Sequence, residues 1–348
     1  MDRCEAPIVA TAPTAAGEAR ARVLYAFREA VAGRLAAVTR EEWLRSRTFA
    51  GAGIDPERLR AARAAAGLGV SVVLPALEVA DTIGPICAAV RERWMGPGGL
   101  VEELVVVDGG SSDGTAAAAR DAGATVVQEA DLVPEAGPGR GKGEAMWKSL
   151  AATTGDLVAW LDADVEDFDP DFVPGLLGPL LTNPEIQYVK AAYRRPLGGS
   201  EDDGGRVTEI AARPLLSRFF PDLAVFAQPL SGEAAGRRAL LERLPFLTGY
   251  AVEIGLLIDV HAAVGLAGMA QVELTPRRHR NQPTAALGRM AAAVGEAVMA
   301  RADGRPPQAA PYVRPLITDG NRTLSELPVE VAQRPPIASY RRDGRPAA

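Results

Sequence analysis

The chain has 348 residues, a length that suits one large domain or two smaller ones. Hydrophobic residues make up 47% and charged residues 24% of it, which is the composition of a globular protein with a substantial core. The formal net charge of -6 provides no global positive field, so we expect neither nucleic acid nor an anionic membrane as a partner. An anionic substrate would need positive charge that is gathered locally.

The two cysteines, Cys4 and Cys87, have neither the number nor the spacing of a disulfide framework or a zinc site. A reducing, cytoplasmic setting is the simplest interpretation. Residues 1–20 lack the apolar core of a signal peptide. No stretch approaches the roughly 18 uninterrupted apolar residues of a membrane-spanning helix, so none is expected.

Residues 1–40 are expected to form an N-terminal extension that is partly disordered. Residues 1–20 are rich in Ala, Pro and Thr, a composition typical of disorder. Residues 21–39 carry apolar side chains at helical spacing, which predicts an amphipathic helix. A second short helix is expected at Pro56–Ala66, which is rich in Ala and Arg.

Short apolar runs then alternate with helical segments. We expect strands at residues 70–74, 104–107, 125–128 and 157–161. Helices are expected at about 81–94, from the end of the GGSSDGT motif to 122, and at 284–301. This alternation predicts parallel βαβ units and a sheet that is covered on both faces.

Polar motifs follow three of the predicted strands. They are PALE at Pro75–Glu78, DGGSSDG at Asp108–Gly114 and DAD at Asp162–Asp164. Ligands of parallel α/β sheets bind beyond the carboxyl ends of the strands. The sequence therefore predicts an active site where these three motifs converge.

The DAD motif is a candidate metal site. Side chains two apart on an extended chain point the same way, so the carboxylates of Asp162 and Asp164 are expected to face one site. One or two carboxylates together with phosphate oxygens hold Mg²⁺ or Mn²⁺ on a nucleoside diphosphate. The alternative is a solvated acidic loop, but the position after a buried strand favours the metal.

Three segments gather positive charge in this acidic chain. Gly139–Glu144 (GRGKGE) places two cations between glycines and can wrap phosphates, although it lacks the spacing of a P-loop. Arg277–Asn281 (RRHRN) is the densest cationic cluster and contains one of the two histidines, a good metal ligand. Gly204–Thr208 (GGRVT) can hold a small anion. The alternatives are a flexible basic loop, a basic surface turn and a helix cap, respectively.

The motifs VSVVLPAL, DGGSSDGT, GKGEAMWKSL and WLDADV resemble the nucleotide-binding half of a GT-A glycosyltransferase. The later motifs GGRVTEIAARPLL, QPLSGE, FLTGYAVEIGLLID and AQVELTPRRHRNQP resemble the glucosyl-3-phosphoglycerate synthases of glycosyltransferase family 81. The resemblance runs from about Trp43 to Arg301. It implies an α/β fold: a GT-A type, Rossmann-like nucleotide-binding sheet with a mixed α/β acceptor-binding C-terminal half.

The resemblance also implies a reaction. Glucose would pass from UDP-glucose to 3-phosphoglycerate with retention of configuration and with Mg²⁺ or Mn²⁺ as cofactor, in a cytoplasmic enzyme whose relatives are often homodimers. The implied catalytic residues are Asp164, Glu253 and His279, of which Asp164 and His279 would bind the metal. The implied nucleotide-sugar residues are Pro75, Ser111, Lys142, Asp162 and Arg277, and the implied acceptor residues are Gly205, Arg206, Thr208 and Asn281.

Four regions follow from these assignments. Residues 1–40 are the extension, 41–197 the nucleotide-sugar-binding half and 198–305 the acceptor-binding half. Residues 306–348 are a Pro- and Arg-rich C-terminal segment, which we expect to become a tail from Gln333 onward.

One position departs from the family pattern. The family reads PALNEE at the first strand end, whereas this chain reads PALEVA, so the carboxylate that helps to grip the nucleotide falls at Val79. A related retaining transferase with another nucleotide sugar or phosphorylated acceptor is therefore an alternative. A non-catalytic nucleotide-sugar binder and a nucleotidyltransferase are the lesser alternatives.

Overall fold

The computed structural model describes residues 38–195, 205–276, 284–318 and 320–340. The expectations for residues 1–37, and those for Arg277, His279 and Asn281, lie outside the described residues. Within the described ranges, no helix combines the length and the apolar character that crossing a membrane requires.

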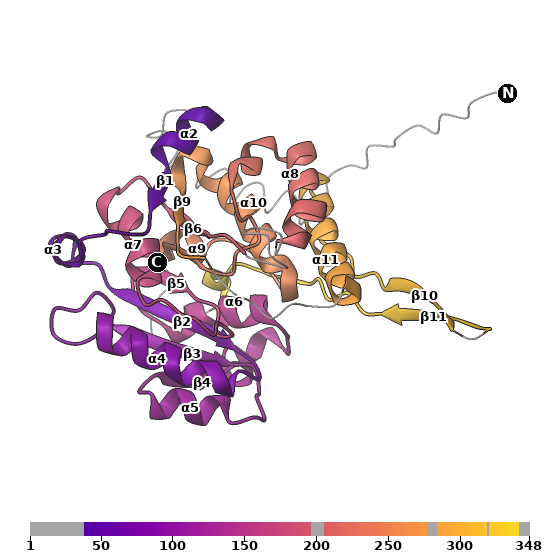
Figure 1. Ribbon diagram of the computed structural model, residues 1–348, viewed down its shortest axis with the longest axis horizontal. Coiled ribbons are helices and arrows are strands. Elements are labelled where there is room, and N and C mark those ends of the chain that lie inside the picture. Colours follow the sequence, from indigo (N-terminus) through magenta and orange to yellow (C-terminus); the bar gives the residue numbers. More distant parts are fainter. Residues whose placement is uncertain (1–37, 196–204, 277–283, 319, 341–348) are drawn as a thin grey trace.

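The described strands build an eight-stranded sheet in the order β1-β9-β6-β7-β5-β2-β3-β4 (Figure 1). All four predicted strands are confirmed, with ends that differ by one or two residues. The bounds are β1 Thr48–Ala50, β2 Val70–Ala76, β3 Glu103–Asp108, β4 Thr125–Gln128, β5 Leu157–Trp160, β6 Tyr188–Ala192, β7 Ala234–Arg237 and β9 Met269–Glu273.

Side chains along the strands alternate between two hydrophobic cores, as the pleat of a sheet requires. Val73 belongs to one core and its neighbours Val72 and Leu74 belong to the other. The first core includes side chains of α6 (Lys142–Ala152), α10 (Val252–Val264) and α11 (Thr284–Ala302), and the second includes those of α4 (Ala80–Trp94) and α7 (Phe172–Thr182). The sheet is therefore covered on both faces, as predicted.

Local signals fix the shorter helices. The predicted helix α3 (Pro56–Ala66) begins after Asp55, whose side chain accepts a hydrogen bond from the backbone N–H of Glu57, and it ends at Gly67 with φ 62°. The other α-helices in the described part of the chain are α2 Arg40–Ser46, α5 Thr115–Asp121, α8 Arg213–Phe219 and α9 Arg238–Leu241.

Strand β7 runs antiparallel to both β5 and β6, whereas the predicted strands β2, β3, β4 and β5 pair in parallel, as expected. A parallel strand at this place would be entered from the amino end of β5. The chain instead enters β7 at the carboxyl end of β5, where Ala234 pairs with Trp160. This register brings the residues just before β7 beside the residues just after β5.

The C-terminal segment also differs from expectation. Strands β10 (Tyr312–Thr318) and β11 (Asn321–Leu327) form an antiparallel hairpin that projects from the body of the molecule (Figure 1). The prediction of a tail from Gln333 is wrong as far as Tyr340, because β12 (Gln333–Arg334) pairs with β8 (Phe246–Leu247).

Arg334 explains why this segment packs. Its Nε lies 2.7 Å from Oε2 of Glu144, a carboxylate with 0% exposure in helix α6. A buried carboxylate is costly unless it is paired, so the guanidinium is held against the body of the protein. The Pro- and Arg-rich composition suggested solvation, whereas this arginine serves as a structural cation.

A second buried ion pair gives a stability prediction. Arg301 and Asp259 lie 2.8 Å apart with both side chains at 0% exposure. We expect Asp259→Asn to lower the free energy of unfolding by about 3–5 kcal/mol, because it leaves a buried guanidinium without its counter-charge. The matched control is Glu57→Gln, whose carboxylate is 81% exposed beside Arg60 and should contribute less than about 1 kcal/mol. Urea unfolding of both variants measures the difference, and equal losses would contradict the prediction.

Candidate active site

The three strand-end motifs converge, as predicted. Strands β5, β2 and β3 are parallel neighbours, with Val73 paired to Trp160 and Ala76 paired to Asp108. Their carboxyl ends therefore lie along one edge of the sheet. The PALE, DGGSSDG and DAD segments leave the sheet side by side at this edge.

Lys142, Asp162 and Glu253 form the charged centre of this edge and are called the donor cluster below. Lys142 is the first residue of α6, Asp162 follows β5, and Glu253 lies in the first turn of α10. The Lys142 Nζ donates to Oδ1 of Asp162 and lies 3.1 Å from Oε1 of Glu253. Three predicted site residues from distant parts of the sequence are thus brought together.

The donor cluster holds Lys142 in its cationic form. Burial by itself would lower the pKa of this ammonium, but the charges of Asp162 and Glu253 outweigh burial and raise the pKa above its ordinary value. Lys142 is therefore a fixed positive charge at the edge of the sheet over the whole physiological pH range.

Gly232 is a site residue that was not singled out from the sequence. A Cβ atom at this position would collide with the Asp162 carboxylate and the Lys142 ammonium. The register of β7 against β5 explains the contact, because position 232 precedes Ala234 as position 162 follows Trp160. The signal was present in the QPLSGE motif, but its meaning depends on a strand pairing that the motif does not reveal.

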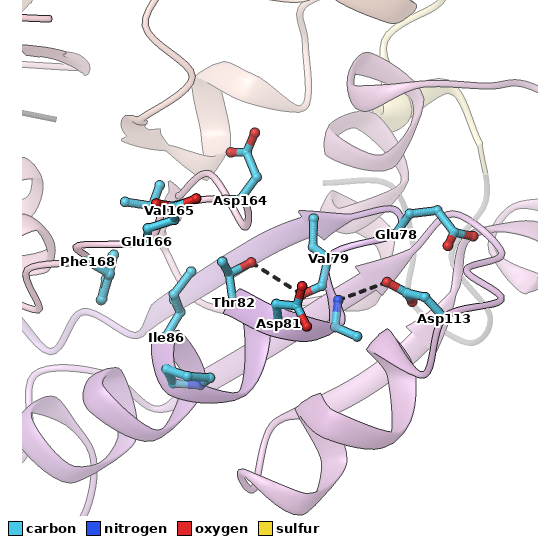
Figure 2. Close-up of a pocket in the computed structure, with 12 residues that line it drawn as sticks. Glu78, Val79, Asp81, Thr82, Ile86, Asp113, Asp164, Val165, Glu166 and Phe168 are labelled. Atoms are coloured by element: carbon cyan, nitrogen blue, oxygen red, sulfur yellow. Dashed lines mark hydrogen bonds between the residues drawn. The ribbon is translucent and has the colours of Figure 1, made fainter. Parts of the chain in front are cut away.

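Asp164 lies in different surroundings from Asp162. It is exposed and lines a pocket of about 440 Å³ that also contains Val79, Asp113 and Glu166 (Figure 2). Strand β5 ends at Trp160, so the regular alternation of side chains is not maintained through the motif. Asp162 instead turns to Lys142, and Asp164 faces the pocket.

The donor set around Asp164 suits a cation that is shared with a substrate. Carboxylate oxygens are hard ligands, and Mg²⁺ commonly takes one or two of them together with phosphate oxygens and water. Within the described ranges no three His, Cys, Asp or Glu side chains are placed to hold a metal by themselves. The second predicted ligand, His279, lies outside these ranges.

The predicted acceptor residues Gly205, Arg206 and Thr208 lie together, where the chain enters a helical segment, and are called the acceptor turn below. The backbone N–H of Glu209 donates to the carbonyl of Gly205 at 3.0 Å, and Thr208 is 2% exposed. Thr208–Ala212 forms a short π-helix that continues into α8. The structure thus agrees with the helix-cap interpretation, which is compatible with anion binding at the same place.

Comparison with known proteins identifies the family. The model of "Glycosyl transferase family 2" matches residues 71–244. The glucosyl-3-phosphoglycerate synthase of Mycolicibacterium smegmatis is 46% identical over 283 residues, which are 80% of this chain and 92% of that protein. The chain belongs to the glucosyl-3-phosphoglycerate synthase family. The family member from Petrotoga mobilis is 46% identical over 67% of this chain and 73% of its own length.

Solved structures agree with this assignment. A crystal structure of the Mycobacterium tuberculosis glucosyl-3-phosphoglycerate synthase in complex with Mn²⁺, UDP-glucose and phosphoglyceric acid matches with a TM-score of 0.76 at 44% identity, covering 85% of this chain and 99% of that one. A crystal structure of mannosyl-3-phosphoglycerate synthase from Rubrobacter xylanophilus matches with a TM-score of 0.79 at 43% identity, covering 88% and 100%. The GT-A fold is thereby confirmed.

Glu78 does not replace the family carboxylate that is absent at Val79. Its backbone takes the left-handed conformation with φ 54°, and its Oε1 accepts hydrogen bonds from the N–H of Ser112 at 2.8 Å and from the Ser112 hydroxyl at 3.1 Å. Figure 2 shows Glu78 beside Asp113 at one end of the pocket, away from Asp164. Glu78 therefore ties two loops together, and Val79 gives the pocket an apolar wall at the position where the family pattern predicts an acid.

Two neighbouring predictions are refined by the same loops. Asp108 is 1% exposed, and its oxygens accept hydrogen bonds from Ser111 and from Gln128. Its carboxylate is occupied within the protein rather than turned toward a ligand. The Ser111 hydroxyl, which the family pattern places in the nucleotide pocket, accepts from the backbone N–H of Glu78 at 3.0 Å. Pro75 is half-buried near the end of β2.

Lys190 is a buried lysine that was also not singled out from the sequence. It lies in β6 with 1% exposure, and its Nζ donates to the backbone carbonyl of Ser231 at 2.8 Å. Burial lowers its pKa to about 7, although the Glu253 carboxylate acts in the opposite direction. A lysine inside the apolar run YVKAA was the available signal.

The lowered pKa of Lys190 makes stability depend on pH. Between about pH 7 and the ordinary value of 10.5, the unfolded chain binds a proton that the folded protein does not. The free energy of unfolding should therefore rise with pH in this window, by up to about 1.4 kcal/mol per pH unit. The variant Lys190→Met lacks this titration.

Urea unfolding at about pH 6, 7.5 and 9 tests the linkage. The stability of the wild-type protein relative to Lys190→Met should be constant below pH 7 and should increase above it. Parallel pH profiles for the two proteins would show that Lys190 titrates at its ordinary value.

Proposed function

We propose that this chain is a retaining glucosyl-3-phosphoglycerate synthase that transfers glucose from UDP-glucose to 3-phosphoglycerate. The supporting observation is the donor cluster of Lys142, Asp162 and Glu253, which lies beside the exposed Asp164 at the strand-end edge. A structure that is 44% identical over 85% of this chain holds Mn²⁺, UDP-glucose and phosphoglyceric acid together.

Donor binding is assigned to the loops at this edge, with residues 41–197 as the nucleotide-sugar-binding half. The permanently charged Lys142 would attract the diphosphate, and Asp162 would orient Lys142 and contact the nucleoside side of the donor. Glu253, which is only 8% exposed, would lie against the transferred sugar. The proposed nucleotide-sugar residues are Pro75, Ser111, Lys142, Asp162 and Arg277.

Asp164 and His279 would hold Mg²⁺ or Mn²⁺ at the diphosphate. When bound, the cation neutralises the charge that develops on the departing nucleoside diphosphate. An oxygen-rich, open site is the environment in which such cations retain positions for substrate oxygens.

Residues 198–305 would form the acceptor-binding half, with Gly205, Arg206, Thr208 and Asn281 holding the phosphate and carboxylate of 3-phosphoglycerate. The acceptor hydroxyl would attack the anomeric carbon from the face that the diphosphate leaves. The bond from that carbon to the phosphate oxygen breaks as the new glycosidic bond forms, and the hydroxyl proton passes to the departing phosphate. This route needs no protein nucleophile and preserves the anomeric configuration. A cytoplasmic homodimer is the proposed form of the enzyme.

The direct test is product identification. Incubation of the protein with UDP-glucose, 3-phosphoglycerate and Mg²⁺ should release UDP and give a phosphorylated α-glucoside that mass spectrometry and NMR identify. Omission of either substrate is the control. Absence of this product with folded protein would reject the proposed reaction.

A related transferase with another donor is the second candidate. It is favoured by the apolar Val79 in the pocket and by the likeness to a structure named mannosyl-3-phosphoglycerate synthase. A panel of UDP- and GDP-sugars, each assayed with 3-phosphoglycerate, separates the two candidates. Faster turnover with a donor other than UDP-glucose would favour the second.

Asp164 should be required for turnover but not for folding. Because its side chain is exposed, Asp164→Asn should change the free energy of unfolding by less than about 0.5 kcal/mol. It should lower kcat/KM at least about 100-fold, because the cation binds more weakly and no longer stabilises the leaving group. The control is Asp167→Asn, an exposed acid outside the pocket lining, which should retain activity. Equal activities of the two variants would refute the role of Asp164.

Gly232→Ala should disrupt donor binding through a single methyl group. The new Cβ would displace the Asp162 carboxylate and the Lys142 ammonium from each other. We expect UDP to bind at least about tenfold more weakly, a change of about 1.4 kcal/mol that calorimetry in the presence of Mg²⁺ can measure. The control Gly178→Ala adds a methyl group in α7 that meets only ordinary contacts at 3.8 Å or more. Unchanged UDP affinity in Gly232→Ala would contradict the assignment of the donor cluster.

A further inference from the structure

The segment from Gln228 to Gly232, called the bridge below, connects the two parts of the site. At one end, the side-chain amide of Gln228 is 6% exposed and lies 3.8 Å from the place that a Cβ on Gly205 would occupy, next to Thr208. At the other end, Gly232 packs against Asp162 and Lys142. The bridge therefore reaches from the acceptor turn to the donor cluster in a few residues.

Most of the bonds within the bridge do not fix its place on the sheet. The N–H of Ser231 donates to the carbonyl of Gln228 at 3.1 Å, and the Ser231 hydroxyl donates to the carbonyl of Glu233 at 3.1 Å. These bonds shape the turn. The bridge is tied to the sheet at Ser231 by Lys190, whose Nζ reaches from β6 to the Ser231 carbonyl.

Stability alone does not explain a lysine at this position. A buried amine is costly even with one hydrogen bond, and a methionine of similar length would fill the same space without that cost. The charged groups that act on Lys190 are Glu253 of α10, Lys142 of α6, Asp162 after β5 and Arg195 after β6. Two of these are acidic and two are basic, so the surroundings supply no excess negative charge that would require a cation.

We propose that Lys190 is a positioning residue that holds the bridge, and through it fixes the acceptor turn relative to the donor cluster. The inference rests on the proposed function, because it assigns the two ends of the bridge to the two substrates. The proposed role of Lys190 acts through the Ser231 carbonyl and not through a contact with either substrate. Its contribution is the alignment of an attacking hydroxyl with a sugar carbon that another part of the site binds.

Misalignment has a recognisable kinetic signature. A displacement of about 1 Å between reacting groups can lower the rate about 100-fold while each substrate still binds to its own contacts. Loss of the Lys190 hydrogen bond should therefore lower kcat and leave both Michaelis constants nearly unchanged. A general loss of structure would lower stability, and it would not affect kcat while sparing the Michaelis constants.

The experiment compares Lys190→Met with Lys148→Met. Lys148 is the control for the loss of a buried lysine, since its side chain is 3% exposed and its Nζ donates to the backbone carbonyl of Glu129 at 3.0 Å. Because Lys148 also pairs with the carboxylates of Glu129 and Glu144, its replacement should lower stability at least as much as that of Lys190. The measurements are kcat, the Michaelis constants for UDP-glucose and 3-phosphoglycerate, thermal stability, and hydrogen–deuterium exchange of residues 228–233. Exchange does not depend on turnover.

In Lys190→Met we expect kcat to fall about 10- to 100-fold, both Michaelis constants to stay within about threefold, and exchange in the bridge to accelerate. In Lys148→Met, kcat should stay at the wild-type value, and exchange in the bridge should remain slow. If Lys190→Met does not fold, Lys190→Gln replaces it, because the glutamine amide keeps a hydrogen-bond donor. In that variant we expect a smaller fall in kcat, again with nearly unchanged Michaelis constants.

Wild-type kcat and unchanged exchange in the Lys190 variant would overturn the proposal, as would equal losses in the two lysine variants. A rise in only one Michaelis constant at constant kcat would also overturn it. Failure of the wild-type protein to transfer glucose to 3-phosphoglycerate would instead reject the proposed function. The exchange result then still decides whether Lys190 holds the bridge.

Discussion

The placement of one ammonium group between two carboxylates organises this site. Lys142, at the start of α6, meets Asp162, which follows β5, and Glu253, which lies in α10. Their contact forms only when α6, β5 and α10 are packed correctly, so the cluster depends on the tertiary fold. The cluster also carries one more negative than positive charge. In the proposed reaction, a divalent cation would supply the additional positive charge that an anionic donor needs at this cluster.

The antiparallel strand β7 is the architectural step that makes this cluster part of a two-substrate site. Because β7 starts where β5 ends, the segment before it passes directly over Asp162. The same segment begins beside Gly205 and Thr208. A parallel strand at this place in the sheet would be entered from the opposite edge, and the two parts of the site would then lack a short covalent connection.

Local sequence patterns were sufficient for the strands and helices that frame the site. The apolar run VSVVL, the Asp55-Pro56 start of α3 and the three strand-end motifs each carry their signal within a few residues. The direction of β7 and the packing of Arg334 depend on partners that lie far away in the sequence, so no local pattern contains them. Gly232 and Lys190 were missed for the same reason. Their roles appear only when β5, β6 and β7 are paired, whereas Lys142, Asp162 and Glu253 lie in motifs that the family resemblance already marked.

The ion pair between Arg334 and Glu144 has a consequence for the order in which the protein matures. Glu144 belongs to the same helix as Lys142, yet its guanidinium partner is 190 positions further along the chain. Until residue 334 has been synthesised, Lys148 of the same helix is the cation that can pair with Glu144. The packing around α6 is therefore completed only by the C-terminal segment, so a chain that ends before residue 334 would carry every strand-end motif without the guanidinium that pairs with Glu144 in the folded protein.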